Sequence, residues 1–158
     1  EKEIIPLIEF ANCNKIDLRF IELMPMNVAK NFKAVNEDDL KAVISKKYGA
    51  LKQIDVFEGP AHYYQVENLS IKIGFISALS HKFCANCNRL RLTSTGMLKP
   101  CLHYNSGVNL NDLLKKNVTD EEILAIIKDT IYHKPKNHHL ENEAFSQKED
   151  KSMSLIGG

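Results

Sequence analysis

FCANCNRLRLTSTGMLKPCL, residues 83–102, contains three of the chain's four cysteines, spaced as Cys84-x2-Cys87-x13-Cys101. A Cys-x2-Cys pair on a tight turn can bring two thiolates to one metal centre, but the third ligand must then return from further along the chain. Fully extended, the intervening residues would span about 40 Å at the usual strand rise. The chain between Cys87 and Cys101 therefore has to fold back on itself.

The residues between these two cysteines have the pattern of a β-hairpin. Residues 90–93 and 97–99 are of extended type, and residues 93–96 between them are a turn signal that ends on glycine, where a positive φ is easiest. Such a hairpin places Cys101 roughly opposite Cys87, because the two lie almost equally far from the turn. The spacing thus predicts that the third cysteine returns to the first two.

Two arginines, Arg89 and Arg91, come shortly after the second cysteine. Strict alternation along a strand would put Cys87, Arg89 and Arg91 on one face and Leu90 and Leu92 on the other. We therefore expect the arginines to point toward the metal side. On an arbitrary hairpin, charged residues of this kind more often form the solvated face.

The cysteine spacing alone leaves two kinds of metal centre open. Structural zinc takes four protein ligands, and His81 or His103 could complete a Cys3His set. A [4Fe–4S] cluster held by three cysteines leaves one iron without a protein ligand. A disulfide is disfavoured, because the fourth cysteine, Cys13, is isolated and no signal peptide indicates an oxidising compartment.

Further motifs extend this pattern along the chain in both directions. They are RFIELMP at 19–25, GPA at 59–61, YY at 63–64, GFI at 74–76, GML at 96–98, CL at 101–102, KP at 134–135 followed by His138, and MSLIGG at 153–158. Together with residues 83–93, this series resembles the C-terminal half of the molybdenum cofactor biosynthesis protein A family, the radical-SAM GTP 3′,8-cyclases. The combination is far more specific than any one motif.

The resemblance implies an α+β fold: the last αβ unit or units of a partial radical-SAM barrel, followed by an antiparallel sheet and helices that carry an auxiliary iron–sulfur site. It implies a [4Fe–4S] cluster on Cys84, Cys87 and Cys101, with the open iron available to substrate. It also implies that Met24 lines the S-adenosylmethionine site, and that the full-length enzyme carries a second [4Fe–4S] cluster.

The resemblance further implies a substrate and a reaction. Arg89, Leu90 and Arg91 would bind GTP, which the family converts to 3′,8-cyclo-7,8-dihydroguanosine 5′-triphosphate in molybdenum cofactor biosynthesis, a lyase reaction. The terminal Gly157 and Gly158 are expected to enter the catalytic cavity, where residues without side chains can approach a crowded radical site.

The sequence departs from the family in one feature that the family's activity requires. The family's first cluster uses a Cys-x3-Cys-x2-Cys motif, which this sequence lacks, and the chain opens on Glu1 rather than Met. We expect an excised C-terminal portion that is inactive alone. We expect a homodimer only for the full-length protein. The expected domains are a barrel remnant at 1–30, a cluster and GTP-binding domain at 31–140 and a polar tail at 141–158.

Composition limits the other classes of function. The chain has 158 residues, of which 44% are hydrophobic, enough for a globular core. No apolar run approaches the roughly 20 residues of a membrane span, and we expect a cytoplasmic protein with no membrane partner. A net charge of only +1 drives no general binding to nucleic acid, so nucleotide recognition must be local.

Apolar periodicity and capping residues predict the remaining elements. Helices are expected at 4–11, after an Asn36 cap, after an Asn109 cap, and after a capping box formed by Thr119 with Glu122. Strands are expected at 17–23, 51–57, 63–68 and 71–79, with the last two antiparallel.

Two other functions fit the same cysteines. One is a non-catalytic Cys3His zinc module for macromolecular contacts, and the other is the auxiliary-cluster domain of a different radical-SAM enzyme. A bound zinc would leave the protein colourless, whereas an iron–sulfur cluster would make it brown. A GTP 3′,8-cyclase and a different radical-SAM enzyme would be distinguished by whether GTP changes the spectrum of the cluster.

Overall fold

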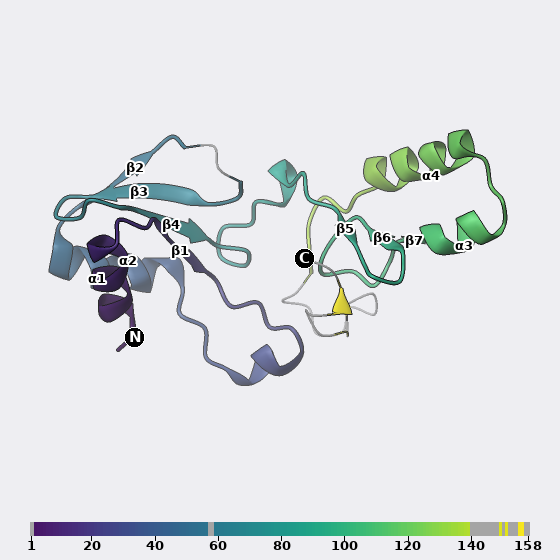
Figure 1. Ribbon diagram of the computed structural model, residues 1–158. Coiled ribbons are helices and arrows are strands. Elements are labelled where there is room, and N and C mark those ends of the chain that lie inside the picture. The colour runs from purple at the N-terminus through teal and green to yellow at the C-terminus, as the bar shows by residue number, and fades with distance from the viewer. Residues whose placement is uncertain (1, 57–58, 140–148, 150, 152–154, 157–158) are drawn as a thin grey trace. The chain divides into compact units, whose positions relative to one another are not determined.

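The computed structural model describes residues 2–56, 59–139, 149, 151 and 155–156 and has an α+β fold (Figure 1). Contacts divide the chain into two compact units. The first comprises residues 1–24 and 32–83, and the second comprises residues 25–31 and 84–158. The α+β class expected from the sequence is confirmed, whereas the predicted domain boundaries at residues 30 and 140 stay predictions.

The first unit is built on a four-stranded mixed sheet. Its strands are β1 (Leu18–Ile21), β2 (Leu51–Ile54), β3 (His62–Val66) and β4 (Lys72–Ile76), in the order β1-β4-β3-β2. β1 runs parallel to β4, and β3 is antiparallel to both β2 and β4. The predicted antiparallel pairing of β3 with β4 is confirmed.

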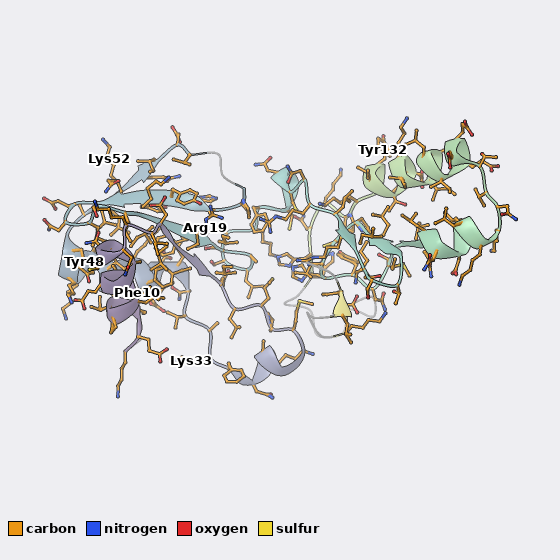
Figure 2. The ribbon with its side chains drawn as sticks, in the orientation of Figure 1. Phe10, Arg19, Lys33, Tyr48, Lys52 and Tyr132 are labelled. Atoms are coloured by element: carbon orange, nitrogen blue, oxygen red, sulfur yellow. The ribbon has the colours of Figure 1, made fainter. Side chains whose placement is uncertain are left out.

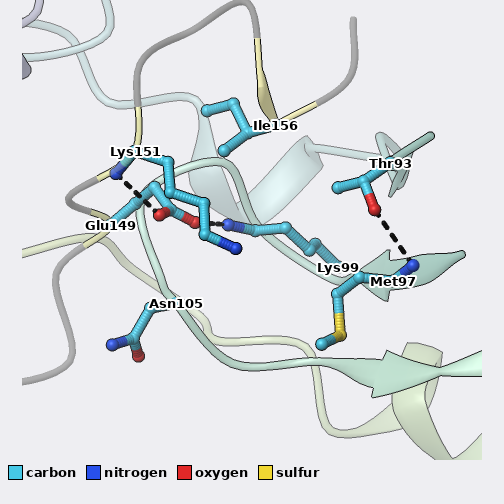
Figure 3. A pocket seen from close by; sticks show the side chains of 7 residues that line it. All are labelled: Thr93, Met97, Lys99, Asn105, Glu149, Lys151 and Ile156. Atoms are coloured by element: carbon cyan, nitrogen blue, oxygen red, sulfur yellow. Dashed lines mark hydrogen bonds and ion pairs between the residues drawn. The ribbon is translucent and has the colours of Figure 1, made fainter. Parts of the chain in front are cut away.

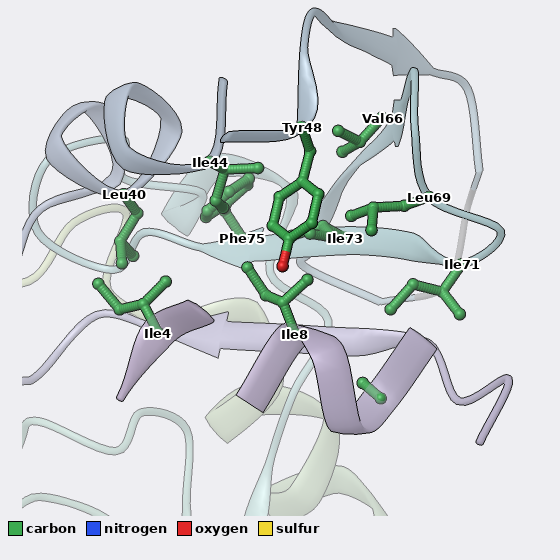
Figure 4. Close-up of a cluster of buried hydrophobic side chains, with 11 residues drawn as sticks. Ile4, Ile8, Leu40, Ile44, Tyr48, Val66, Leu69, Ile71, Ile73 and Phe75 are labelled. Atoms are coloured by element: carbon green, nitrogen blue, oxygen red, sulfur yellow. The ribbon is translucent and has the colours of Figure 1, made fainter. Parts of the chain in front are cut away.

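Two helices pack against this sheet and close the core. They are α1 (Ile4–Cys13) and α2 (Glu37–Tyr48), and α2 begins where the Asn36 side chain accepts a hydrogen bond from the Asp39 amide at 2.8 Å. Figure 4 shows side chains of both helices meeting those of the strands. The buried cluster consists of Ile4, Ile8, Ala11, Leu40, Ile44, Tyr48, Val66, Leu69, Ile71, Ile73 and Phe75.

The apolar residues of α1 are only partly buried in the core. Ile4, Ile8 and Ala11 are buried as expected, but Leu7 keeps 45% of its surface exposed. Phe10 is also exposed on this helix and is labelled in Figure 2. The helix therefore carries apolar residues outside its core-facing stripe.

The second unit contains the cysteine hairpin. A 3-10 turn, η2 (Cys84–Asn86), precedes the antiparallel sheet β5 (Arg91–Leu92), β6 (Met97–Lys99) and β7 (Val108–Asn109), whose order is β5-β6-β7. The short 3-10 helix η1 (Asn27–Asn31) belongs to the same unit. The hairpin of β5 and β6 was expected, whereas neither β7 nor η1 was.

The turn between β5 and β6 forms as its sequence predicts. Gly96 has a φ of 83°, which glycine adopts without the steric cost other residues meet. Its amide donates to the Thr93 carbonyl at 3.0 Å, and the Thr93 amide donates to the Met97 carbonyl at 3.0 Å. The register pairs Arg91 with Lys99.

Two helices follow the hairpin, α3 (Leu110–Lys115) and α4 (Asp120–Tyr132). The Asn109 cap and the capping box of Thr119 with Glu122 are both present, as predicted. No residue of α4 is buried, and Tyr132 at its end is 86% exposed (Figure 2). The helical structure of α4 is therefore stabilised by its caps and by the intrinsic helix propensity of its residues more than by packing in a core.

Candidate functional site

A single 3-10 turn holds the first two cysteines. The Cys87 amide donates to the Cys84 carbonyl at 3.2 Å, which closes the turn across η2. Both thiols are half-buried. The local fold therefore matches the tight Cys-x2-Cys turn that a shared metal centre requires.

Cys101 lies two residues beyond Lys99, the last residue of β6, which pairs with Arg91 in β5. Burial raises the pKa of its thiol, and charge on Cys84 and on Cys87 raises that pKa further. A hydrogen bond from the backbone of His103 partly opposes the rise in the pKa.

Lys134 anchors the loop that follows Cys87. Its ammonium donates to the Cys87 Sγ at 3.3 Å, to the Cys87 carbonyl at 2.8 Å and to the Arg89 carbonyl at 2.6 Å. Sequence reasoning noted the Lys-Pro motif at 134–135 but assigned the lysine no role. Nothing local indicates one, because the two partners lie 47 and 45 residues away.

The alternation predicted from Cys87 to Arg91 stays a prediction. Only Arg91 and Leu92 form a strand, and residues 87–90 adopt no regular structure. Carbonyls of Cys87 and Arg89 accept hydrogen bonds from Lys134 instead of from a neighbouring strand. The regular strand on which the prediction relied is therefore absent at residues 87–90.

A cavity of about 340 Å³ is lined by the four consecutive residues Arg89, Leu90, Arg91 and Leu92. Burial lowers the pKa of Arg91, and the neighbouring charge of Arg89 lowers it further, whereas Cys101 opposes this. An arginine stays charged despite such a shift. The wall of the cavity is thus cationic, with leucines beside the two guanidinium groups.

Two histidines lie together beside the cysteine hairpin. His103 and His138 are buried, and their rings contact edge to face at a centroid distance of 5.0 Å. Burial lowers the pKa of His103 to about 4, aided by His138 and by the charges of Arg91 and Lys99. Its Nδ1 has no hydrogen-bond partner among the described residues. His81, the other proposed fourth ligand, lies in the first unit with its Nδ1 3.6 Å from Glu37.

A second cavity of about 220 Å³ joins the hairpin to the C-terminal segment (Figure 3). Its lining residues are Thr93, Met97, Lys99, Asn105, Glu149, Lys151 and Ile156. Lys99 forms an ion pair with Glu149, and both side chains are only 3% exposed. Ile156 is fully buried. The predicted catalytic residues Gly157 and Gly158 lie outside the described residues.

Met24, the predicted S-adenosylmethionine contact, is half-buried and follows β1 in the first unit. Nearby, the carboxylate of Glu22 accepts hydrogen bonds from the amides of Leu79 and Ser80 at 2.7 and 3.0 Å. These contacts fix the loop ends that follow β1 and β4. The role of Met24 itself stays a prediction.

The three thiols have the ligand chemistry of either zinc or an iron–sulfur cluster. Across the described ranges, however, no group of three or more His, Cys, Asp or Glu side chains is arranged to hold a metal ion. The case for a metal centre therefore rests on the chemistry of the three cysteines and on their spacing in the sequence. Among the same residues, no helix has the length and apolar character to span a membrane.

Residues 16–140 match the family described as Molybdenum Cofactor Synthesis C. The chain belongs to this family, which agrees with the order of motifs around its cysteine hairpin.

Similar proteins carry a more specific name. The GTP 3′,8-cyclase of Clostridium perfringens (strain SM101 / Type A) is 44% identical over 99% of this chain, and that of Syntrophomonas wolfei subsp. wolfei is 37% identical over 100%. The GTP 3′,8-cyclase of Clostridium botulinum (strain Hall) is 39% identical over 95%. The chain covers 49%, 49% and 47% of these relatives, and so spans about half their length.

Proposed function

We propose that this chain is the substrate-binding C-terminal region of a radical-SAM GTP 3′,8-cyclase of molybdenum cofactor biosynthesis. The observation that carries the proposal is the cavity walled by Arg89 and Arg91 on the loop that follows the Cys84–Cys87 turn, in a hairpin that leads on to Cys101. Cys84, Cys87 and Cys101 would hold a [4Fe–4S] cluster. The names and coverage of the relatives support the same assignment.

The residues present suit an anionic cluster and an anionic substrate together. A three-thiolate [4Fe–4S] cluster, when bound, supplies an iron without a protein ligand, to which a substrate atom can bind. The triphosphate of GTP adds further negative charge. Arg89 and Arg91 offset that charge with permanently charged, bidentate groups, and Leu90 and Leu92 give apolar surface beside them.

The rest of the enzyme follows from the same proposal. Residues 1–30 would complete a partial radical-SAM barrel, with Met24 at the S-adenosylmethionine site and a second [4Fe–4S] cluster on the remaining half of the protein. Gly157 and Gly158 would enter the catalytic cavity. The whole protein would be a cytoplasmic homodimer, with GTP as its substrate and neither nucleic acid nor membrane as a partner.

Nucleotide binding to the anaerobically reconstituted chain tests this proposal. Arg89→Ala and Arg91→Ala should each weaken GTP binding roughly ten- to a hundredfold, because a charge-assisted hydrogen bond is worth about 1.5–3 kcal/mol. Iron content should stay normal, since neither side chain is a ligand. Lysine at either position should restore only part of the affinity.

The matched control is Lys115→Ala, which removes an exposed positive charge from α3. It should bind GTP like the parent. If both arginine variants also bind like the parent, the cavity at residues 89–92 is not the nucleotide site.

A Cys3His zinc module is the second candidate function. It is favoured by one observation: the buried Nδ1 of His103 has no hydrogen-bond partner within the described part of the chain, and the His103 backbone already contacts Cys101. Neutral imidazole nitrogen is a normal zinc ligand. Metal analysis after anaerobic reconstitution separates the two, since tight zinc without iron and sulfide would support this candidate alone.

A further inference from the structure

Lys134 directs all of its hydrogen-bonding capacity at one loop. It lies just beyond α4, where its amide donates to the Ile131 carbonyl at 3.2 Å. A lysine ammonium has three protons to donate. They meet the Cys87 Sγ at 3.3 Å, the Cys87 carbonyl at 2.8 Å and the Arg89 carbonyl at 2.6 Å.

This arrangement differs from an ordinary surface lysine. Lys134 is half-buried, and its contacts join the end of α4 to a loop that has no regular hydrogen bonding of its own. Two of the bonds fix the backbone between Cys87 and Arg89, and the third reaches a sulfur atom. A single side chain thus connects the proposed metal ligand with the proposed nucleotide-binding arginine.

We propose that Lys134 is a positioning residue that holds the Cys87 loop in place and raises the reduction potential of the iron–sulfur cluster bound there. The proposal rests on the proposed function, because it needs a cluster on Cys84, Cys87 and Cys101.

The expected direction follows from charge. One-electron reduction adds a negative charge to a cluster, so a nearby ammonium and an N–H···S hydrogen bond stabilise the reduced form more than the oxidised form. Removing both should make reduction harder and the potential more negative. Removing the two carbonyl contacts should also loosen the loop and speed the loss of iron.

The test compares Lys134→Met and Lys134→Arg with a matched control, Lys136→Met, in the reconstituted chain. Lys136 is an exposed lysine two residues further along. Circular dichroism first establishes that each variant is folded. A redox titration followed by electron paramagnetic resonance then gives the potential, and a chelator assay gives the rate of iron release.

Lys134→Met should show a more negative potential and, with a hydrogen bond to a charged group lost, on the order of tenfold faster iron release. Lys134→Arg should lie between it and the parent, because it keeps the charge but not the same three contacts. Lys136→Met should match the parent in both measurements. Failure of Lys134→Met to retain a cluster that Lys136→Met retains would also support the positioning role, provided that Lys134→Arg retains part of it.

The proposal is overturned if Lys134→Met and Lys136→Met have the same potential and the same iron release. It is also overturned if Lys134→Arg is as impaired as Lys134→Met, because charge and positioning would then not be what matters. A parent chain that takes up no iron and sulfide would instead refute the proposed function.

Discussion

Glu37 offers a sharp test of the packing in the first unit. Its side chain is only 5% exposed, forms an ion pair with Lys41 at 2.5 Å and accepts a hydrogen bond from Ser77. Lys41 also donates to the Tyr64 hydroxyl at 2.8 Å. Glu37→Gln keeps an acceptor for Ser77 but removes the charge that pairs with Lys41.

The loss of unfolding free energy in Glu37→Gln depends on whether the Lys41 ammonium stays buried or reaches water. Leaving a fully buried charge without its partner lowers the free energy of unfolding by about 3–5 kcal/mol, whereas losing one hydrogen bond to a charged group lowers it by about 1.5–3 kcal/mol. The Lys41 side chain is 27% exposed and can turn toward water, so the lower range applies. In urea unfolding this corresponds to a midpoint lower by about 1 M or more, for a slope of 1–2 kcal/mol/M.

The effect should also depend on pH in a defined direction. Burial alone would raise the pKa of Glu37, but hydrogen bonds from Lys41 and Ser77 outweigh it and hold the pKa below its ordinary value of 4.5. A carboxylate with a lowered folded-state pKa contributes stability above its unfolded pKa and loses it as the pH falls through the folded pKa. The parent should therefore lose its advantage over Glu37→Gln in acid.

The control is Asp38→Asn, an exposed carboxylate in the same first turn of α2. It removes a comparable charge from the helix N-terminus, which is worth about 0.3–1 kcal/mol. The reasoning is refuted if Glu37→Gln is no more destabilising than Asp38→Asn at pH 7. It is equally refuted if the difference between parent and Glu37→Gln persists unchanged well below pH 4.

Two further predictions concern the core and the chemistry. Ile44→Ala should destabilise the chain by about 2–5 kcal/mol in the same unfolding assay, because Ile44 is fully buried. Leu7→Ala should cost less than that, since Leu7 is 45% exposed, and equal losses would contradict the assigned core. With no Cys-x3-Cys-x2-Cys motif in its sequence, the chain alone should release no 5′-deoxyadenosine from S-adenosylmethionine and reductant. Chromatographic detection of turnover above that of a cysteine-free variant would contradict this.

Local signals in the sequence predicted most of the fold. Residues 93–96 encode their turn through a glycine that takes a positive φ, and Thr119 with Glu122 encodes a helix start within four residues. Both features depend on neighbours in the chain, so one sequence suffices to find them.

Long-range contacts account for what the sequence did not predict. The sequence predicts strand alternation from Cys87, whereas residues 87–90 adopt no regular structure and the carbonyls of Cys87 and Arg89 accept hydrogen bonds from Lys134, just beyond α4. From the sequence alone, a lysine such as Lys99 in a strand is expected to face solvent. In the structure it is buried in an ion pair with Glu149, fifty residues further along the chain. Neither contact leaves a periodic signal in the sequence.

Iron and sulfide analysis of the anaerobically reconstituted chain tests the proposed metal centre most directly. The parent and Cys13→Ser should each bind about four iron and four sulfide per chain, as a [4Fe–4S] cluster requires. Cys84→Ser, Cys87→Ser and Cys101→Ser should each lose most of that content. Tight zinc with no iron and sulfide in the parent, or a loss in Cys13→Ser as large as in the other three variants, would contradict the assignment.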